Sequence, residues 1–444
     1  MRRIAIVGSG ISGLAAAREL AAHARVTLFE AADYFGGHTH TVDATVDGVT
    51  QGVDTGFLVF NERTYPNLIR LFGELQVETA QSDMSFSVQV PGVDGSASLE
   101  WSGSDLNGVF AQRGNLLRPR FWRMLRDLLR FNRLCTGLAE RGADGELVQP
   151  IGDFLAAHRF SREFRDWYFL PMIGCIWSCP TDQMLRFPIT TMIRFCHNHG
   201  LLQVADRPRW FTVRGGARHY VEKIVAGLAD ARLATPVRSI RRLPPAGMPG
   251  GGNAGVWVAT DAGSERFDEV VLACHSNQSL ALLADATDEE RSVLGAIGYH
   301  RNRAVLHTDT AVLPRRRRAW AAWNYERAAD GPREQAAVCL HYLLNKLQPL
   351  PFATPLMVSL NPVAEPRAET VLGEFDYAHP VFDLAAIAAQ RRVPALQGRA
   401  STWFCGAWTR YGFHEDGLSS GLAVASALKA RWAREPAQAA REAA

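Results

Sequence analysis

The feature that most constrains this chain is a glycine-rich loop between a strand and a helix at its N-terminus. Residues 4–7 form an apolar run typical of a buried strand, and the glycine-rich loop follows at once. A helix pattern over 14–20 comes next, then a second strand pattern over 26–29 that ends at Glu30. This order predicts a βαβ unit that binds a dinucleotide. The alternative, a glycine-rich turn without chemical use, leaves the order of the other parts unexplained.

Each part of this unit has a physical task. Gly8 permits the tight turn, Gly10 lets backbone approach a pyrophosphate, and Gly13 lets the helix pack on the strand. The helix N-terminus offers N–H groups to the phosphates, and the Glu30 carboxylate is placed to hold the adenosine ribose hydroxyls. The predicted cofactor contacts in this unit are Gly8, Ser9, Gly10, Ile11, Ser12, Gly13, Glu30 and Ala31.

Later segments favour FAD over NAD, because a simple nicotinamide dehydrogenase has no evident use for them. The turn at 36–37 returns backbone toward the pyrophosphate, with His38 beside it, and Val237 lies in a strand that faces the adenine. Near the C-terminus, a strand-to-turn unit at 403–407 precedes a helix start at 413–421, whose N–H groups face the flavin. The further predicted contacts are Gly36, Gly37, His38, Thr55, Gly56, Phe57, Val237, Gly406, Ala407, Asp416, Gly417 and Leu418.

Composition excludes several classes of protein. The 444 residues are 47% hydrophobic and 21% charged, which describes a globular chain of two to three domains. A net charge of +3 is too small to indicate a nucleic-acid partner. The seven cysteines lack metal-type pairs, so we predict no metal. No apolar run approaches the roughly 18 residues of a spanning helix, and the chain opens directly into a strand. We therefore expect a cytoplasmic protein, or one peripheral on the inner face of the cytoplasmic membrane.

Together these motifs resemble the flavin-containing amine oxidase superfamily over essentially the whole chain. The resemblance implies an α/β fold, in which a Rossmann-like FAD-binding domain of the amine oxidase or glutathione reductase type is joined to a discontinuous α+β substrate domain. On that pattern the FAD-binding domain comprises 1–75, 205–290 and 398–444. The substrate domain comprises 76–204 and 291–397.

Four stretches are similar to a bacterial branch encoded beside cyclopropane-fatty-acid-synthase-like methyltransferases: 56–66, 176–178, 198–202 and 413–417. That branch includes the methyl-fatty-acyl desaturase of furan fatty acid formation. The resemblance implies dehydrogenation of a methyl-branched fatty acyl chain on a membrane lipid. It also implies a lipid methyltransferase as a partner.

The chain departs from the amine-oxidase pattern at three places. Ala407 stands where family members carry an acid for the flavin ribityl chain, and Phe413 stands where a Tyr is common. Of the three lysines only Lys346 is a remote candidate for the lysine that amine oxidases place at the flavin. A simple amine substrate becomes less favoured. The alternatives are an amine oxidase that produces hydrogen peroxide, a fatty acid double-bond isomerase, and a flavin-binding scaffold without turnover.

The best source of catalytic groups is the segment 413–416. Dehydrogenation of a carbon–carbon bond by a flavin requires a base for the proton that leaves. His414 is the candidate base, with Glu415 or Asp416 to orient it or to contact the flavin. The alternative is that these three residues only cap the helix that follows.

A second helix, over 118–135, is amphipathic. Its apolar half, within Phe121–Cys135, contains Trp122, and four arginines occupy the opposite face. This composition is typical of a helix that lies on an anionic membrane. The segment 314–323, with four arginines beside two tryptophans, also favours binding to an anionic membrane. The alternative is a helix that packs on its own domain with a solvated basic face.

Overall fold

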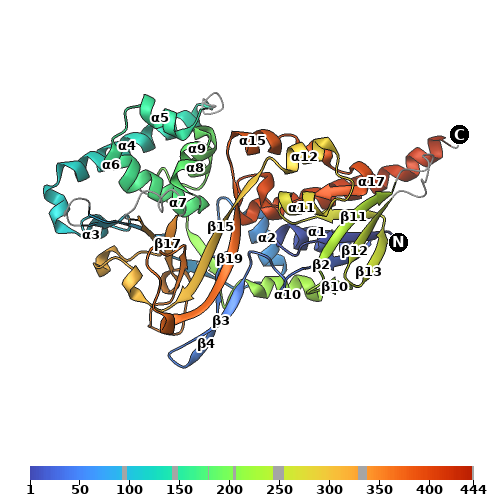
Figure 1. Ribbon diagram of the computed structural model, residues 1–444, viewed down its shortest axis with the longest axis horizontal. Helices are drawn as coiled ribbons and strands as arrows, with labels where there is room; N and C mark the ends of the chain where they lie inside the picture. The colour runs from blue at the N-terminus through green and yellow to red at the C-terminus, as the bar shows by residue number, and fades with distance from the viewer. Residues whose placement is uncertain are drawn as a thin grey trace.

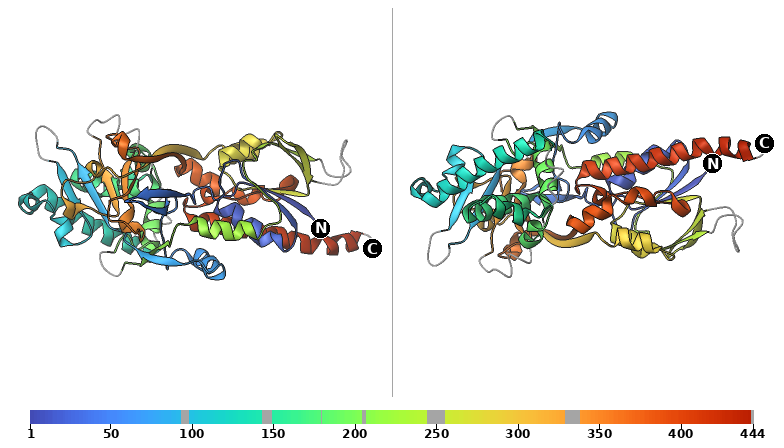
Figure 2. Two further views of the ribbon diagram at one scale, coloured as in Figure 1. Left: turned by 90° about the horizontal axis from the view of Figure 1, so that it is seen from below. Right: turned by 90° about the horizontal axis from the view of Figure 1, so that it is seen from above.

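The computed structural model describes residues 1–92, 98–142, 149–178, 180–203, 207–243, 255–328 and 338–442. Figures 1 and 2 show an elongated molecule, with helix α4 (Pro119–Glu140) at one end and the C-terminal part of helix α17 (His414–Glu442) at the other. Two β-sheets with different architectures organise the two halves. The fold mixes helices with parallel and antiparallel strands, as the α/β prediction requires.

The half that holds both termini is built on a five-stranded sheet, all of whose paired neighbours run parallel. Its strands in spatial order are β10 (Ala231–Arg232), β2 (Arg25–Phe29), β1 (Arg3–Val7), β14 (Glu269–Leu272) and β20 (Thr402–Phe404). Because every strand runs the same way, their carboxyl ends meet at one edge.

Both faces of this sheet are covered, as a parallel sheet requires. One face packs against α1 (Ile11–Ala21), α2 (Pro66–Glu74), α10 (Arg218–Ala226) and α17. The other face packs against a three-stranded antiparallel sheet and several short helices. These elements are β11 (Val237–Leu243), β12 (Gly255–Thr260), β13 (Gly263–Phe267), α11 (Ser276–Leu282), α12 (Asp288–Leu294), α15 (Leu384–Gln390) and α16 (Val393–Leu396).

The other half is built on a seven-stranded sheet, which is antiparallel except where β16 pairs with β7. Its order is β19 (Val371–Val381), β15 (Gly298–His307), β18 (Met357–Leu360), β17 (Cys339–Leu343), β16 (Trp323–Glu326), β7 (Phe86–Val90) and β8 (Leu99–Ser102). One face shares a core with α4, α5 (Ile151–Ala157), α6 (Arg162–Phe164), η3 (Arg165–Phe169), α7 (Leu170–Trp177), α8 (Thr181–Leu185) and α9 (Ile189–Asn198).

Smaller elements connect the halves. They are the hairpin β3 (Thr41–Val46) with β4 (Val49–Asp54), the sheet β5 (Phe60–Asn61), β9 (Trp210–Val213) and β6 (Thr79–Ser82), and α14 (Leu344–Leu347). All strands of the five-stranded sheet come from 1–75, 205–290 and 398–444, and all strands of the seven-stranded sheet come from 76–204 and 291–397. The short helices α15 and α16 are different, because they fall within 291–397 yet share a core with Val7 and Phe29.

Helix α4 forms as the periodicity predicts, but its apolar half does not all face outward. Phe121, Met124, Phe131 and Cys135 are buried in the core beneath the seven-stranded sheet, whereas Trp122 is 49% exposed. Leu125 and Leu128 also pack against this core, so packing inside the domain accounts for most of the apolar positions and leaves Trp122 and Leu129 exposed. Among the described residues, no helix is long and apolar enough to cross a bilayer.

Candidate functional site

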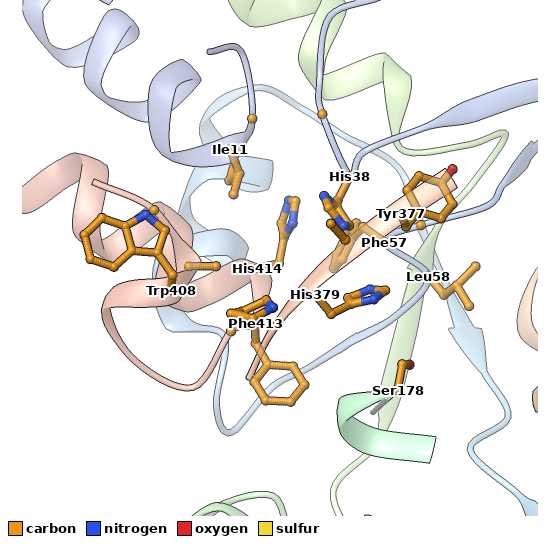
Figure 3. A pocket seen from close by; sticks show the side chains of 18 of the residues that line it. Ile11, His38, Phe57, Leu58, Ser178, Tyr377, His379, Trp408, Phe413 and His414 are labelled. Atoms are coloured by element: carbon orange, nitrogen blue, oxygen red, sulfur yellow. The ribbon is translucent and has the colours of Figure 1, made fainter. Parts of the chain in front are cut away.

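A cavity of about 630 Å³ begins at the carboxyl edge of the five-stranded sheet and continues beside the seven-stranded sheet. Gly8, Glu30, Ala273 and Gly406, which follow the ends of β1, β2, β14 and β20, all line it. Figure 3 shows side chains from both halves converging on this space. In open α/β sheets ligands bind at this edge.

The glycine-rich loop has the geometry that its sequence predicts. Gly8 has φ +101°, a conformation that favours glycine. A Cβ on Gly13 would lie 1.9 Å from the Gly8 carbonyl oxygen, so α1 packs directly on the loop. A Cβ on Gly10 would meet nothing within 4 Å. Gly10 is the N-cap of α1 and no side chain caps it, which leaves open space before the first N–H groups of a helix.

The Glu30 carboxylate is held at the rim of this space. One oxygen accepts hydrogen bonds from Ser9 N at 2.9 Å and Ser9 Oγ at 2.5 Å, and the other accepts from Ala32 N at 2.9 Å. Ser9 Oγ in turn accepts from Gly36 N at 3.0 Å. These bonds tie the first turn of the βαβ unit to the turn at 36–37, as expected for one continuous cradle.

The middle of the cavity is surrounded by histidines and tyrosines. His38 has a buried Nε2 with no hydrogen-bond partner among the described residues. Its ring lies 5.3 Å from that of His379, 5.4 Å from Tyr377 and 6.0 Å from His275. Burial lowers the pKa of His38 and lowers that of His379 to about 3. A buried polar atom without a partner is costly, so the unpaired nitrogen favours a polar ligand here.

His414 lines the cavity next to the ring of Phe57, with centroids 3.8 Å apart in a stacked arrangement. Its Nε2 lies 2.8 Å from the hydroxyl oxygen of Tyr220. Burial, followed by the nearby His38, lowers the pKa of His414 to about 3. The imidazole is therefore neutral at physiological pH, and the same low pKa makes it a weak base in this state of the protein.

Glu415 and Asp416 do not line the cavity, so the expectation that they act on substrate or flavin is not supported by their positions. The Glu415 carboxylate accepts hydrogen bonds from Asn67 N and Leu68 N, both at 3.0 Å, and thereby caps α2. The Asp416 carboxylate accepts from Phe413 N at 3.0 Å, and burial raises its pKa to about 6. Of the three residues, only His414 reaches the cavity.

Most other predicted contacts line the cavity: Ser9, Ile11, Ser12, Gly36, Gly37, Gly56, Phe57 and Ala407. Six do not: Gly13, Ala31, Thr55, Val237, Gly417 and Leu418. Val237 and Leu418 are buried in cores, and a Cβ on Gly417 would lie 2.9 Å from Ile11 Cγ2. Thr55 Oγ1 instead bonds the hydroxyl of Tyr377 at 2.6 Å. Thr55 and Gly417 thus contact residues of the cavity wall, whereas Ala31 is exposed.

Sequence reasoning missed His275, Tyr299, Tyr377, His379 and Trp408, which all line the cavity. His275 could have been found, because it follows β14 at the carboxyl edge of the sheet. Tyr377 and His379 lie on β19 and reach the site only through the long-range pairing of that strand with β15. No local signal in the sequence marks them.

Beyond His38, His275 and His379, the cavity becomes a largely apolar chamber, whose lining also contains Ser178 and His199. Its lining includes Leu58, Val59, Met84, Phe86, Met172, Cys175, Ile176, Phe195, Leu201, Trp210, Trp323, Tyr342 and Phe413. Phe413 stacks on Phe195 with centroids 4.6 Å apart. Lys346, which lies on α14, is not in this lining. Its Nζ instead pairs with Asp83 Oδ2 at 3.0 Å. The chamber is therefore suited to a hydrophobic substrate.

These features fit FAD. The open space at Gly10 and the uncapped start of α1 suit a pyrophosphate, and Glu30 suits a ribose. The unpaired His38 nitrogen lies further along the same cavity, where Gly406 and Ala407 also contribute. The residues that would hold the cofactor thus form one line from the sheet edge to the apolar chamber.

Comparison with known proteins agrees with this geometry. The model of the family described as flavin containing amine oxidoreductase matches residues 11–314. Carotenoid phi-ring synthase from Streptomyces griseus is 29% identical over 301 residues, which are 63% of this chain and 54% of that protein. The chain therefore spans about half the length of this curated relative.

Solved structures share the fold over nearly the whole chain. A CLA-producing fatty acid isomerase from P. acnes has a TM-score of 0.64 at 16% identity, covering 96% of this chain and 98% of that one. Cyclohexylamine oxidase from Brevibacterium oxydans has a TM-score of 0.64 at 16% identity, covering 96% and 99%. The chain belongs to the flavin containing amine oxidoreductase family.

Proposed function

We propose that this enzyme dehydrogenates a long hydrophobic substrate, specifically a methyl-branched fatty acyl chain of a membrane lipid. The observation that carries the proposal is that the dinucleotide cradle and the apolar chamber form one cavity. The names of two similar proteins refer to hydrophobic molecules, a carotenoid and a fatty acid. The proposed two-domain division, with FAD on 1–75, 205–290 and 398–444, places this cavity between the domains.

In this proposal the residues of the chain have distinct tasks. The loop at Gly10 and the Glu30 carboxylate hold FAD, which when bound supplies the acceptor for two electrons. Trp323 and Tyr342 line the chamber together with Phe86, hold the acyl chain by apolar contact and exclude water. His414 lies where cradle and chamber meet and is the proposed acceptor of the proton that leaves the substrate, a role that requires its pKa to rise once flavin and substrate are bound.

The carboxylates that line the cavity argue against a cationic amine as substrate. Among the described lining residues they are Glu30 and Asp376. The Glu30 carboxylate is engaged by Ser9 and Ala32, and Asp376 pairs with Arg301. An ammonium group in the chamber would thus lose its hydration without gaining an anionic partner, which is costly.

A substrate panel tests the proposal, with the initial rate of FAD reduction measured without oxygen. The panel contains a phospholipid with a methyl-branched chain, its unbranched analogue, benzylamine and putrescine. We expect the acyl substrates to react faster than the amines. An amine oxidase would instead show rapid FAD reduction by an amine and release of hydrogen peroxide in air, whereas the lipids would give neither FAD reduction nor hydrogen peroxide.

A pair of variants at Ile176 connects this activity to the chamber. Ile176→Asp places a charge in the apolar lining and should abolish reduction by the acyl chain while FAD stays bound. Ile176→Val keeps an apolar side chain of similar shape and should retain activity. Equal rates in the two variants would place the substrate elsewhere.

We also propose that the enzyme binds an anionic membrane through the end of the molecule that carries α4. Leu106 on α3 (Leu106–Val109) is 77% exposed, and Leu117 on η1 (Arg113–Leu117) is 88% exposed. Trp122 joins them, since its Nε1 donates to the Leu116 carbonyl oxygen at 2.9 Å. The exposed arginines at 315–318 lie nearby, because η5 (Arg317–Ala319) contacts α3.

A lipid methyltransferase is the proposed partner that supplies the branched chain.

A further inference from the structure

Three side chains of metal-ligating type meet on the seven-stranded sheet, outside the cavity. Glu326 ends β16, Cys339 begins β17, and the two residues are paired across the antiparallel strands. His341 follows Cys339 by two positions, so it lies on the same face of β17. The three ligand atoms all lie within 4.8 Å of one another.

The group is on the opposite side of the sheet from the apolar chamber. Trp323 on β16 and Tyr342 on β17 line the chamber. Successive side chains of a strand point to opposite faces, so Glu326, three positions after Trp323, and His341, one position before Tyr342, face the other side. His341 is fully buried and Cys339 is buried, whereas the Glu326 side chain is 22% exposed. A small ion therefore has a route to the group past the Glu326 carboxylate.

The distances between the ligand atoms suit a tetrahedral ion. His341 Nε2 lies 3.0 Å from Glu326 Oε2 and 3.4 Å from Cys339 Sγ, and the sulfur lies 3.7 Å from the same oxygen. Ligands at usual zinc–sulfur, zinc–nitrogen and zinc–oxygen distances are about 3.3–3.6 Å apart at tetrahedral angles. Each observed distance is within about 0.3 Å of that range.

The imidazole of His341 is also supported from behind, as metal-binding histidines usually are. Its Nδ1 lies 2.6 Å from Ser359 Oγ, which in turn lies 2.7 Å from His307 Nε2. The ring is thereby fixed with Nε2 toward Cys339 and Glu326. Without a metal, the same contacts amount to a histidine–carboxylate pair beside a thiol.

We propose that Glu326, Cys339 and His341 bind a divalent zinc ion, with water as the fourth ligand. A thiolate, an imidazole and a carboxylate on one ion match the ligand preferences of zinc. The ion would join β16 to β17 and so stiffen the sheet behind Trp323 and Tyr342. The sequence predicts no metal, because its cysteines lack metal-type pairs.

The test uses the FAD-containing enzyme, purified without chelator, and the bound zinc is quantified by elemental analysis. We expect about one zinc per chain in the wild-type protein and in Cys196→Ser, which removes a buried thiol elsewhere. Cys339→Ser and Glu326→Gln should lose at least half of the zinc while FAD content is unchanged. Glu326→Gln is nearly isosteric and partly exposed, so it should fold even if the buried variant does not.

Cobalt substitution adds an independent readout. Co²⁺ in the wild-type protein should give a thiolate-to-metal charge-transfer band that Cys339→Ser lacks and Cys196→Ser keeps. Folded, yellow wild-type enzyme with neither stoichiometric zinc nor this band would overturn the proposal and leave a hydrogen-bonded pair. Zinc content that is unchanged in both ligand variants would overturn it as well.

Discussion

The Nε2 of His414 lies 2.8 Å from the hydroxyl oxygen of Tyr220, although the two residues are 194 positions apart. Tyr220 in turn bonds Thr39 Oγ1 at 2.5 Å. Through Tyr220 on α10, these contacts join the turn at 36–39 to the start of α17, and both of those segments contribute residues to the cavity. Burial lowers the pKa of His414 and raises that of Tyr220, so both groups are neutral over a wide pH range.

The first prediction concerns acid stability. His414 has a pKa of about 3 when folded and an ordinary value of 6.5 when unfolded, so the unfolded chain binds the proton first. The stability that the neutral imidazole contributes is therefore present above about pH 6.5 and is lost as the pH falls toward about 3.

We expect His414→Gln to lose less stability than the wild-type protein over this window, with unfolding measured by denaturant at saturating FAD. The difference between the two proteins isolates His414 from His379, whose pKa burial also lowers. If the free energy of unfolding depended on pH in the same way in both proteins, the result would contradict a buried, neutral imidazole at His414. If His414 is the base, kcat of the variant should also fall by about 10²–10⁴-fold.

The second prediction separates two glycines of the loop. Gly10→Ala should fold like the wild-type protein, because its Cβ meets nothing within 4 Å, but should bind FAD more weakly by roughly 1–3 kcal/mol. Gly13→Ala should fail to fold, since its Cβ would lie 1.9 Å from a carbonyl oxygen. Circular dichroism and FAD titration measure the two effects. Full FAD affinity in Gly10→Ala would show that the pyrophosphate lies elsewhere.

The third prediction concerns Glu415. Glu415→Ala removes the acceptor for Asn67 N and Leu68 N at the start of α2. The free energy of unfolding should fall by about 0.5–2 kcal/mol, the cost of losing a helix cap, while kcat stays near the wild-type value. Unchanged stability with a collapse of kcat would instead restore the catalytic role that the sequence suggested.

The fourth prediction concerns the membrane. The double variant Leu106→Ser and Leu117→Ser should reduce co-sedimentation with anionic vesicles, because each exposed leucine loses apolar burial in the lipid. Leu372→Ser is the matched control, since Leu372 is 44% exposed on β19, at the opposite edge of the sheet from β8. Wild-type protein that stays in the supernatant at low salt would refute membrane binding.

Features that depend on neighbouring residues in the chain could be predicted from the sequence, whereas features that depend on distant segments could not. Gly8, Gly10, Gly13 and Glu30 act within one βαβ unit, so local pattern was sufficient to predict them. The contact of Glu415 with α2 could not be predicted, because that helix begins about 350 positions earlier in the chain. Helix α4 was predicted correctly as a helix, but a helical wheel shows only that two faces differ. The core packing of Phe121 and Met124 depends on other segments and could not be read from that wheel.

The Glu326, Cys339 and His341 group illustrates the same limit. Strand pairing brings Glu326 opposite Cys339, and the sequence between them gives no sign of that register. Tyr377 reaches the cavity through a comparable pairing of β19 with β15. Long antiparallel pairings of this kind depend on the whole sheet and not on local propensity.

The most direct measurement of the central claim is a single turnover without oxygen. One equivalent of a phospholipid with a methyl-branched chain is mixed with the FAD enzyme, and both the flavin absorbance and the mass of the acyl product are recorded. We predict lasting loss of the flavin colour and an acyl chain lighter by two hydrogens for each FAD reduced. A product of unchanged mass with a moved double bond, or a flavin that the lipid never bleaches, would contradict dehydrogenation.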